Sequence, residues 1–217
     1  MWNSLIINPL TTILHTLVTY TGDIGITIVI FTILVKTILL PLNISSNRTS
    51  KNLKKIQPHI EDLRKKHKND NRTLGLELSK LYKEHKIKPL SGFLALFIQL
   101  PILIGLYTIL IKEIKNISDH FTVLGFDVTS PSYWLAALSF ITMFILMSIS
   151  SKDMKVEEGA SDFQKEFTKM MSLQMKYFMP TIILISSIFL PAGITLYFVV
   201  SNIFGIFQYY VIKKIVK

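Results

Sequence analysis

Polar side chains with helical spacing interrupt the most apolar stretches of this 217-residue sequence. Lys36 lies inside GITIVIFTILVKTILLPL, and Thr32 lies one helical turn before it, on the same face. Gln99 interrupts a second apolar stretch, and a third contains Tyr197, Ser201 and Gln208, with Asn202 beside them. An ammonium group among hydroxyls and amides can attract an acidic group. The same stretches contain no His and no carboxylate, so they lack the base or the metal ligands that covalent or metal chemistry would need.

Lys36 needs an explanation, because a charged side chain in mid-membrane costs at least ~2.5–3.5 kcal/mol on insertion scales. Its stem could extend toward the cytoplasmic head groups, since Leu42 is about 9 Å further along a helix. Alternatively, it lies in a water-filled cavity, which the polar stripes on three apolar stretches favour. Each Ser or Thr could equally make an ordinary interhelical hydrogen bond, and Ser201 with Gly205 could be small-residue packing. Apart from Asp23 just outside the first stretch, no carboxylate is near, so the partner of Lys36 is water, lipid phosphate or an arriving group.

The apolar stretches have the length of membrane spans. Hydrophobic residues make up 50% of the chain and mean hydropathy is +0.44. A helix needs ~20 apolar residues to cross the hydrocarbon core. We therefore predict an integral membrane protein, with Pro191 and Gly193 forming a tight reversal between the last two of five spans, at about 24–42, 91–111, 132–150, 174–190 and 193–212.

The distribution of Lys and Arg predicts the orientation of these spans. Segment 43–89 holds 13 of them, 151–176 holds 5 and 213–217 holds 3, against 2 in 112–131 and none in 1–24. The positive-inside rule places the first three segments in the cytoplasm and the N-terminus outside. The sequence has no cysteine, so disulfides and thiol chemistry are excluded.

Two further segments complete an all-α architecture. Residues 1–22 have a helical period with a polar face, which predicts an amphipathic helix on the outer surface, and residues 23–217 form the membrane core. Within that core, 43–89 reads as a cytoplasmic antiparallel helical hairpin that is kinked or broken at Pro58. Its apolar seam consists of Leu53, Ile56, Ile60, Leu63, Leu74, Leu78 and Leu81. With 13 basic and 5 acidic residues the hairpin carries +8, which suits RNA, anionic lipid or an acidic protein, or merely a solvated face.

The order of several fragments resembles the five-span core of the YidC/Oxa/Alb membrane protein insertases. The fragments are GITIVIFTILVKTILLPL, KIQPHIEDLRKKH, LSKLYKEHKIKPLSG, FIQLPILIGLY and FMPTIILISSIFLPAGITLYFVVSNIFGIFQ. In that family the first core span carries a basic residue in a hydrophilic groove that opens to cytoplasm and lipid and is closed toward the outside. Lys36 stands at the matching position, where the family usually has arginine. The printed sequence also lacks the large periplasmic domain, the lipoprotein signal and the long basic tail of some members.

The resemblance implies an insertase of the bacterial cell membrane that is not an enzyme and uses no cofactor. Its partners would be nascent membrane proteins and the bilayer, with a ribosome, targeting factors or a Sec-type translocon as further partners, and it would act as a monomer. The substrate-binding groove would be lined by Lys36, Thr32, Gln99, Tyr197 and Ser201.

Two other functions fit the sequence less well than an insertase. A small transporter or channel could use Lys36 as an anion site, but no repeat relates the first two spans to the last two. An intramembrane enzyme would need embedded catalytic groups, and neither H-E-x-x-H nor a nucleotide-binding G-x-x-x-x-G-K-[ST] motif occurs.

Overall fold

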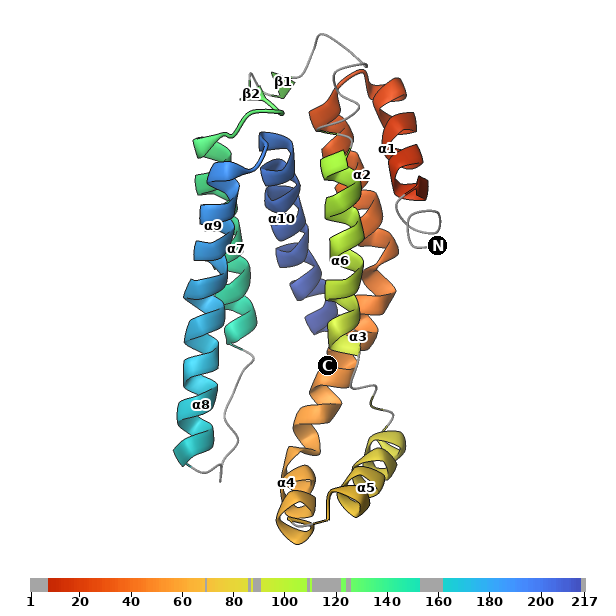
Figure 1. Ribbon diagram of the computed structural model, residues 1–217, viewed down its shortest axis with the longest axis vertical. Helices are drawn as coiled ribbons and strands as arrows, with labels where there is room; N and C mark the ends of the chain where they lie inside the picture. Colours follow the sequence, from red (N-terminus) through yellow and green to blue (C-terminus); the bar gives the residue numbers. More distant parts are fainter. Residues whose placement is uncertain are drawn as a thin grey trace. The chain divides into compact units, whose positions relative to one another are not determined.

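Helices dominate the computed structural model, which describes residues 8–68, 70–85, 87, 91–108, 110, 122–123, 126–152 and 162–215 (Figure 1). Some predictions fall partly on residues outside these ranges: the outer helix at residues 1–7, most of the outer segment 112–131, part of the cytoplasmic segment 151–176, and the last two residues. The chain divides into two compact units, which are described separately. The larger unit comprises Met1–Ile38 and Pro101–Val211, and the smaller unit comprises Leu39–Leu100 and Ile212–Lys217.

The secondary structure is helical except for one short pair of antiparallel strands. Thr122 pairs with Asp127, and Val123 with Phe126. Ten α-helices and one π-helical segment are assigned within the described ranges. In chain order the elements are α1 (Asn8–Thr21), α2 (Ile24–Ile38), α3 (Leu40–Lys55), α4 (Gln57–Lys66), α5 (Asn71–Glu84), α6 (Ser91–Thr108), β1 (Thr122–Val123), β2 (Phe126–Asp127), α7 (Tyr133–Ser151), α8 (Asp162–Leu173), η4 (Gln174–Phe178), α9 (Met179–Phe189) and α10 (Ala192–Ile215).

A tight turn joins α1 to α2, and the two helices pack together. Gly22 has a φ of 64°, a left-handed conformation that glycine adopts without steric cost. The Asp23 carboxylate then accepts a hydrogen bond from the Ile26 N–H at 2.8 Å, which satisfies one of the free donors at the start of α2. This turn fixes where the helix that carries Lys36 begins.

Three described helices are long and apolar enough to cross a membrane: Tyr133–Ser151, Thr168–Phe189 and Ala192–Ile215. A fourth is reached if α2 and the start of α3 are one broken span, while the apolar part of α6 at Gln99–Thr108 is shorter. The predicted single helix over 24–42 is therefore wrong in detail, because α2 ends at Ile38 and α3 begins at Leu40. Pro41 explains the break, since it has no N–H to continue the helical ladder.

The loop before α7 supplies hydrogen-bond acceptors to the start of α10. The Ala192 N–H donates to the Ser130 carbonyl and the Gly193 N–H to the Val128 carbonyl, both at 2.9 Å. Asp127 orders this loop by accepting from the hydroxyls of Thr129 and Ser130, each at 2.6 Å. These hydrogen bonds also hold the pKa of the Asp127 carboxyl below its usual value.

Gly193 lies inside α10, so the prediction that it helps to form the reversal is wrong; the helices are separated at Leu190 and Pro191. A Cβ at position 193 would lie 2.9 Å from both methyl carbons of Leu110 and 3.1 Å from Ile28 Cδ1. An alanine here would therefore have to displace the ends of the Leu110 and Ile28 side chains.

In the smaller unit, α4 and α5 lie side by side (Figure 1). They pack through a small apolar cluster. Its buried members are Ile56, Ile60 and Ile87, with Leu53, Leu78, Leu81 and Tyr82 packed around them. The chain breaks between α3 and α4 next to Pro58, as the sequence predicts.

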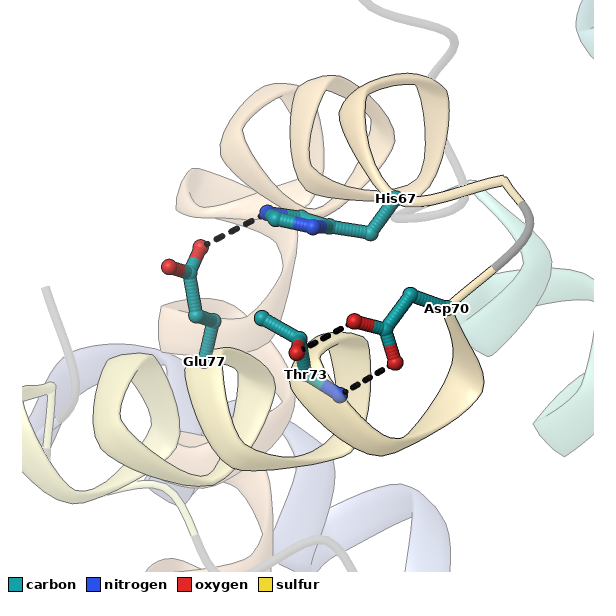
Figure 2. A network of polar contacts seen from close by, with 4 residues as sticks. All are labelled: His67, Asp70, Thr73 and Glu77. Atoms are coloured by element: carbon teal, nitrogen blue, oxygen red, sulfur yellow. Dashed lines mark hydrogen bonds and ion pairs between the residues drawn. The ribbon is translucent and has the colours of Figure 1, made fainter.

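Polar contacts hold the turn between α4 and α5 (Figure 2). Asp70 caps α5, accepting from the Thr73 N–H at 3.0 Å and the Thr73 hydroxyl at 2.5 Å. Those two bonds lower the pKa of the Asp70 carboxyl from its ordinary value. His67 Nε2 lies 3.3 Å from Glu77 Oε2, within ion-pair distance but without hydrogen-bond geometry.

Candidate functional site

The contact between Gly193 and Ile28 sets the register of α10 against α2 in the larger unit. Both helices start at the same end and run in the same direction (Figure 1). Residues four apart share a helix face, so one turn further Tyr197 is level with Thr32, and a second turn brings Ser201 level with Lys36. Each turn advances about 6 Å at ~1.5 Å per residue. By this helical repeat, four of the five predicted groove residues fall at two levels along α2 and α10.

Burial divides these two levels. At the first, Thr32 is fully buried and Tyr197 is 1% exposed. The Thr32 hydroxyl donates to the Ile28 carbonyl of its own helix at 2.6 Å, so its hydrogen is already used. At the second level Ser201 is 9% exposed, and Lys36 is partly buried in the last turn of α2. The predicted groove residues nearer Gly193 are therefore buried, and Lys36 is more accessible than they are.

Lys36 has no ion-pair partner in the described part of the chain, which matches its isolation in the sequence. It is the one charged residue of α2. The neighbouring level consists of Thr32 and Tyr197. Their hydroxyl groups carry no charge and cannot neutralise an ammonium ion. An acidic group that reached Lys36 would meet an uncompensated positive charge.

Gln99, the fifth predicted groove residue, belongs to the smaller unit and is partly buried in α6. The polar stripe on α10 continues past Ser201 with Asn202 and Gln208, each 7% exposed. The Thr195 hydroxyl is fully buried without a hydrogen-bond partner in the described ranges. The buried residues of α10 thus include polar side chains at intervals along the helix.

Sequence reasoning missed a set of buried hydroxyls on α7 and α9. Ser139 and Ser187 are both fully buried, with their Oγ atoms 3.2 Å apart. Thr142 lies one turn from Ser139 and hydrogen-bonds to Asn202 of α10. The spacing of Ser139 and Thr142 inside an apolar helix was an available signal, but single Ser and Thr residues are common in membrane helices and do not mark a site alone.

A cavity of about 280 Å³ lies at the loop before α7. It is lined by Asp127, Ser130, Pro131, Ser132, Tyr133 and Trp134. None of the predicted groove residues contributes to it. Within the described ranges no three His, Cys, Asp or Glu residues cluster as metal ligands would.

Comparison with known proteins identifies the wider group to which the chain is similar. A family model described as 60Kd inner membrane protein matches residues 16–217. The membrane protein insertase YidC of Fusobacterium nucleatum is 33% identical over 205 residues, covering 93% of this chain and 92% of the relative. The YidC of Wigglesworthia glossinidia brevipalpis is 32% identical over the whole of this chain, but the match spans 38% of that protein's length.

A solved structure has the same fold over nearly the whole chain. It is described as an active YidC insertase crystal structure with the first transmembrane domain resolved. The TM-score is 0.59 at 25% identity, with 97% of this chain and 47% of the other covered. The similarity therefore extends over almost all of this chain and over part of the longer relatives.

Proposed function

Since this chain belongs to the 60Kd inner membrane protein family, whose curated relatives are membrane protein insertases, we propose that it inserts nascent membrane proteins into the bilayer through a hydrophilic groove. The groove is lined by Lys36, Thr32, Gln99, Tyr197 and Ser201. The observation that supports this proposal is the contact of Gly193 with Ile28, because the helical repeat counted from it puts Ser201 at the height of Lys36.

The mechanism needs no nucleotide. The polar flank of a nascent protein enters the groove from the cytoplasm, so the distance it must cross through hydrocarbon becomes shorter. Lys36 attracts acidic residues on that flank, because it has no carboxylate of its own nearby in the described chain. The apolar segment of the cargo then moves along α7 and α10 into lipid, and burial of its ~20 apolar residues drives the process.

The proposed topology follows the distribution of basic residues. Five spans place the N-terminus outside and the C-terminus in the cytoplasm, with 1–22 as an outer-face helix and 43–89 as a cytoplasmic helical hairpin. The protein works as a monomer, and the basic hairpin is the surface for a ribosome, a targeting factor or a Sec-type translocon. The family match leaves no support for the rival anion transporter or channel.

Reconstitution tests the insertase function. Purified protein in liposomes is supplied with a newly synthesised single-span substrate, and insertion is measured by protection of its translocated flank from protease. We expect protection that exceeds that of protein-free liposomes and does not change when nucleotide is removed. Equal protection with and without the protein would refute the proposal.

Cysteine labelling tests the groove separately, because the chain has no native cysteine. A cysteine at Lys36 or Ser201, the more accessible of the two levels, should react with a water-soluble thiol reagent during insertion, since reaction requires thiolate and therefore water. Ile30 supplies the lipid-facing control, being 39% exposed on the same helix as Lys36. Equal labelling of Ile30→Cys and Lys36→Cys would contradict a localised aqueous groove.

A further inference from the structure

One face of α10 meets one face of α7 in the larger unit. On α7 the contacting residues are Ser139, Thr142 and Leu146, which are three and four apart and thus share a face. On α10 they are Asn202 and Gly205, three apart. A Cβ at position 205 would lie 3.0 Å from Leu146 Cδ2, so the end of the Leu146 side chain lies against the glycine.

Asn202 provides the side-chain hydrogen bonds across this interface in the described chain. Its Nδ2 donates to the Thr142 Oγ1 at 3.3 Å and to the Ser139 carbonyl at 3.4 Å. The Thr142 hydroxyl hydrogen is used within α7, on the Leu138 carbonyl at 2.9 Å, so its oxygen is left to accept. Both Asn202 bonds are longer than the usual 2.7–3.2 Å range and are therefore weak.

The other partner of α7 is joined differently. The Ser139 hydroxyl donates to the Ala136 carbonyl at 2.8 Å, so in the pair with Ser187 it is the serine of α9 that donates. Moreover, α7 and α9 pack along their lengths, whereas α7 and α10 meet at a few residues. The α7–α10 interface is therefore the weaker of the two.

We propose that Asn202 is a reversible latch that holds α10 against α7, and that these helices part at Asn202 and Gly205 when a substrate segment passes into lipid. This role rests on the proposed insertase function. A buried amide must recover hydrogen bonds when the helices separate, because an unpaired one is costly in an apolar medium. Water in the groove can supply them, so the latch opens toward the groove and closes again when the segment has left.

A covalent lock tests whether the helices must part. The double variant Leu146→Cys/Gly205→Cys replaces the two residues in closest contact, and the smaller side chain at 146 makes room for the new Cβ at 205. On oxidation we expect a disulfide and insertion close to that of protein-free liposomes, with recovery on reduction. Each single variant under the same oxidant is the control. Full insertion by the oxidised protein, or failure of the disulfide to form, would overturn the proposal.

A second measurement isolates the latch itself. In the Leu146→Cys background, the thiol reacts with a water-soluble maleimide when the interface opens. Asn202→Leu and Thr142→Val remove the hydrogen bond while keeping side-chain volume, and each should raise the labelling rate about threefold, the average effect of one hydrogen bond between membrane helices. Ser187→Ala removes the hydroxyl from α9 and should leave the rate unchanged. No change with Asn202→Leu, or an equal rise with Ser187→Ala, would refute the latch.

These outcomes separate the latch from the insertase function. Insertion by unmodified protein is measured in the same preparation. If it is present while the lock has no effect, the latch is wrong and the insertase function stands. If unmodified protein does not insert while the disulfide forms normally, the interface is as described and the proposed function is wrong.

Discussion

Replacing Lys36 should impair insertion according to the charge of the cargo. We expect Lys36→Ala to reduce insertion of a substrate whose translocated flank contains Asp, with a much smaller effect when that residue is Asn. Lys36→Arg should preserve insertion because it keeps the positive charge. Lys36→Glu should be worse than Lys36→Ala, since it repels the acidic flank.

The position of Lys36 sets the size of the effect. Two opposite charges 4 Å apart attract by about 1 kcal/mol in bulk water and by about 4 kcal/mol at an effective dielectric constant near 20. Lys36 is partly buried beside the packed level of Thr32 and Tyr197, so its surroundings lie between these limits. Even the lower value gives about a fivefold preference for the Asp substrate over the Asn substrate, which Lys36→Ala should abolish.

The assay is single-round insertion into liposomes that contain equal amounts of folded wild-type or variant protein. The measured quantity is the ratio of initial insertion rates for the Asp and Asn substrates. Raising the salt concentration should reduce this ratio only modestly, because a partly buried ion pair is screened less than an exposed one. Lys36→Ala that slows both substrates equally would refute the attraction and leave Lys36 as an anchor that extends toward the cytoplasmic head groups.

Three further predictions concern other parts of the chain. Deleting residues 50–86 should reduce insertion while the larger unit stays folded, as judged by retention of the Leu146→Cys/Gly205→Cys disulfide. Full insertion activity after the deletion would mean that the basic hairpin is only a linker. Gly193→Ala should destabilise the protein in detergent by about 1–3 kcal/mol through overpacking against Leu110. The control Gly75→Ala has nothing within 4 Å of its new Cβ and should be neutral or stabilising. Equal effects of the two substitutions on stability would contradict the contact with Leu110. The folded-state pKa of Asp70 is lowered, so the stabilisation by its cap is present above the unfolded pKa and is lost as pH falls through the folded value, below about pH 4. Thr73→Val should raise the pKa of Asp70 in a carboxyl NMR titration. An unchanged titration would show that the Thr73 hydroxyl does not cause the lowered pKa.

The sequence predicted those parts of the fold that follow from local chemistry. The predicted third span, 132–150, lies within one residue of the helix Tyr133–Ser151 at each end, because a long apolar run between polar segments leaves little choice. The break near Pro58 was confirmed, since a missing N–H acts at its own position in the chain. The break after Ile38 follows from the same property of Pro41 but was masked by the continuous apolar run around it.

Features that depend on two distant segments were not predictable from one sequence. Gly193 looked like a turn residue because it follows Pro191, and its contact with Leu110 and Ile28 appears only when the helices are assembled. The pairing of Ser139 with Ser187 likewise joins residues 48 positions apart. For the groove, helical spacing predicts Thr32 and Lys36 on one face, but it could not predict that Thr32 and Tyr197 are almost completely buried, because burial depends on tertiary packing.

The capped start of α10 also affects whether an acidic group of a substrate could be held at that end of the helix. The first N–H groups of a helix carry partial positive charge and form a common anion-binding site when they are free. Here the Ala192 and Gly193 N–H groups are occupied by two backbone carbonyls of the preceding loop. The first two donors of this helix are therefore not free to bind an anion. In the proposed mechanism, a carboxylate that has passed Lys36 would find no free N–H group at these two positions to retain it.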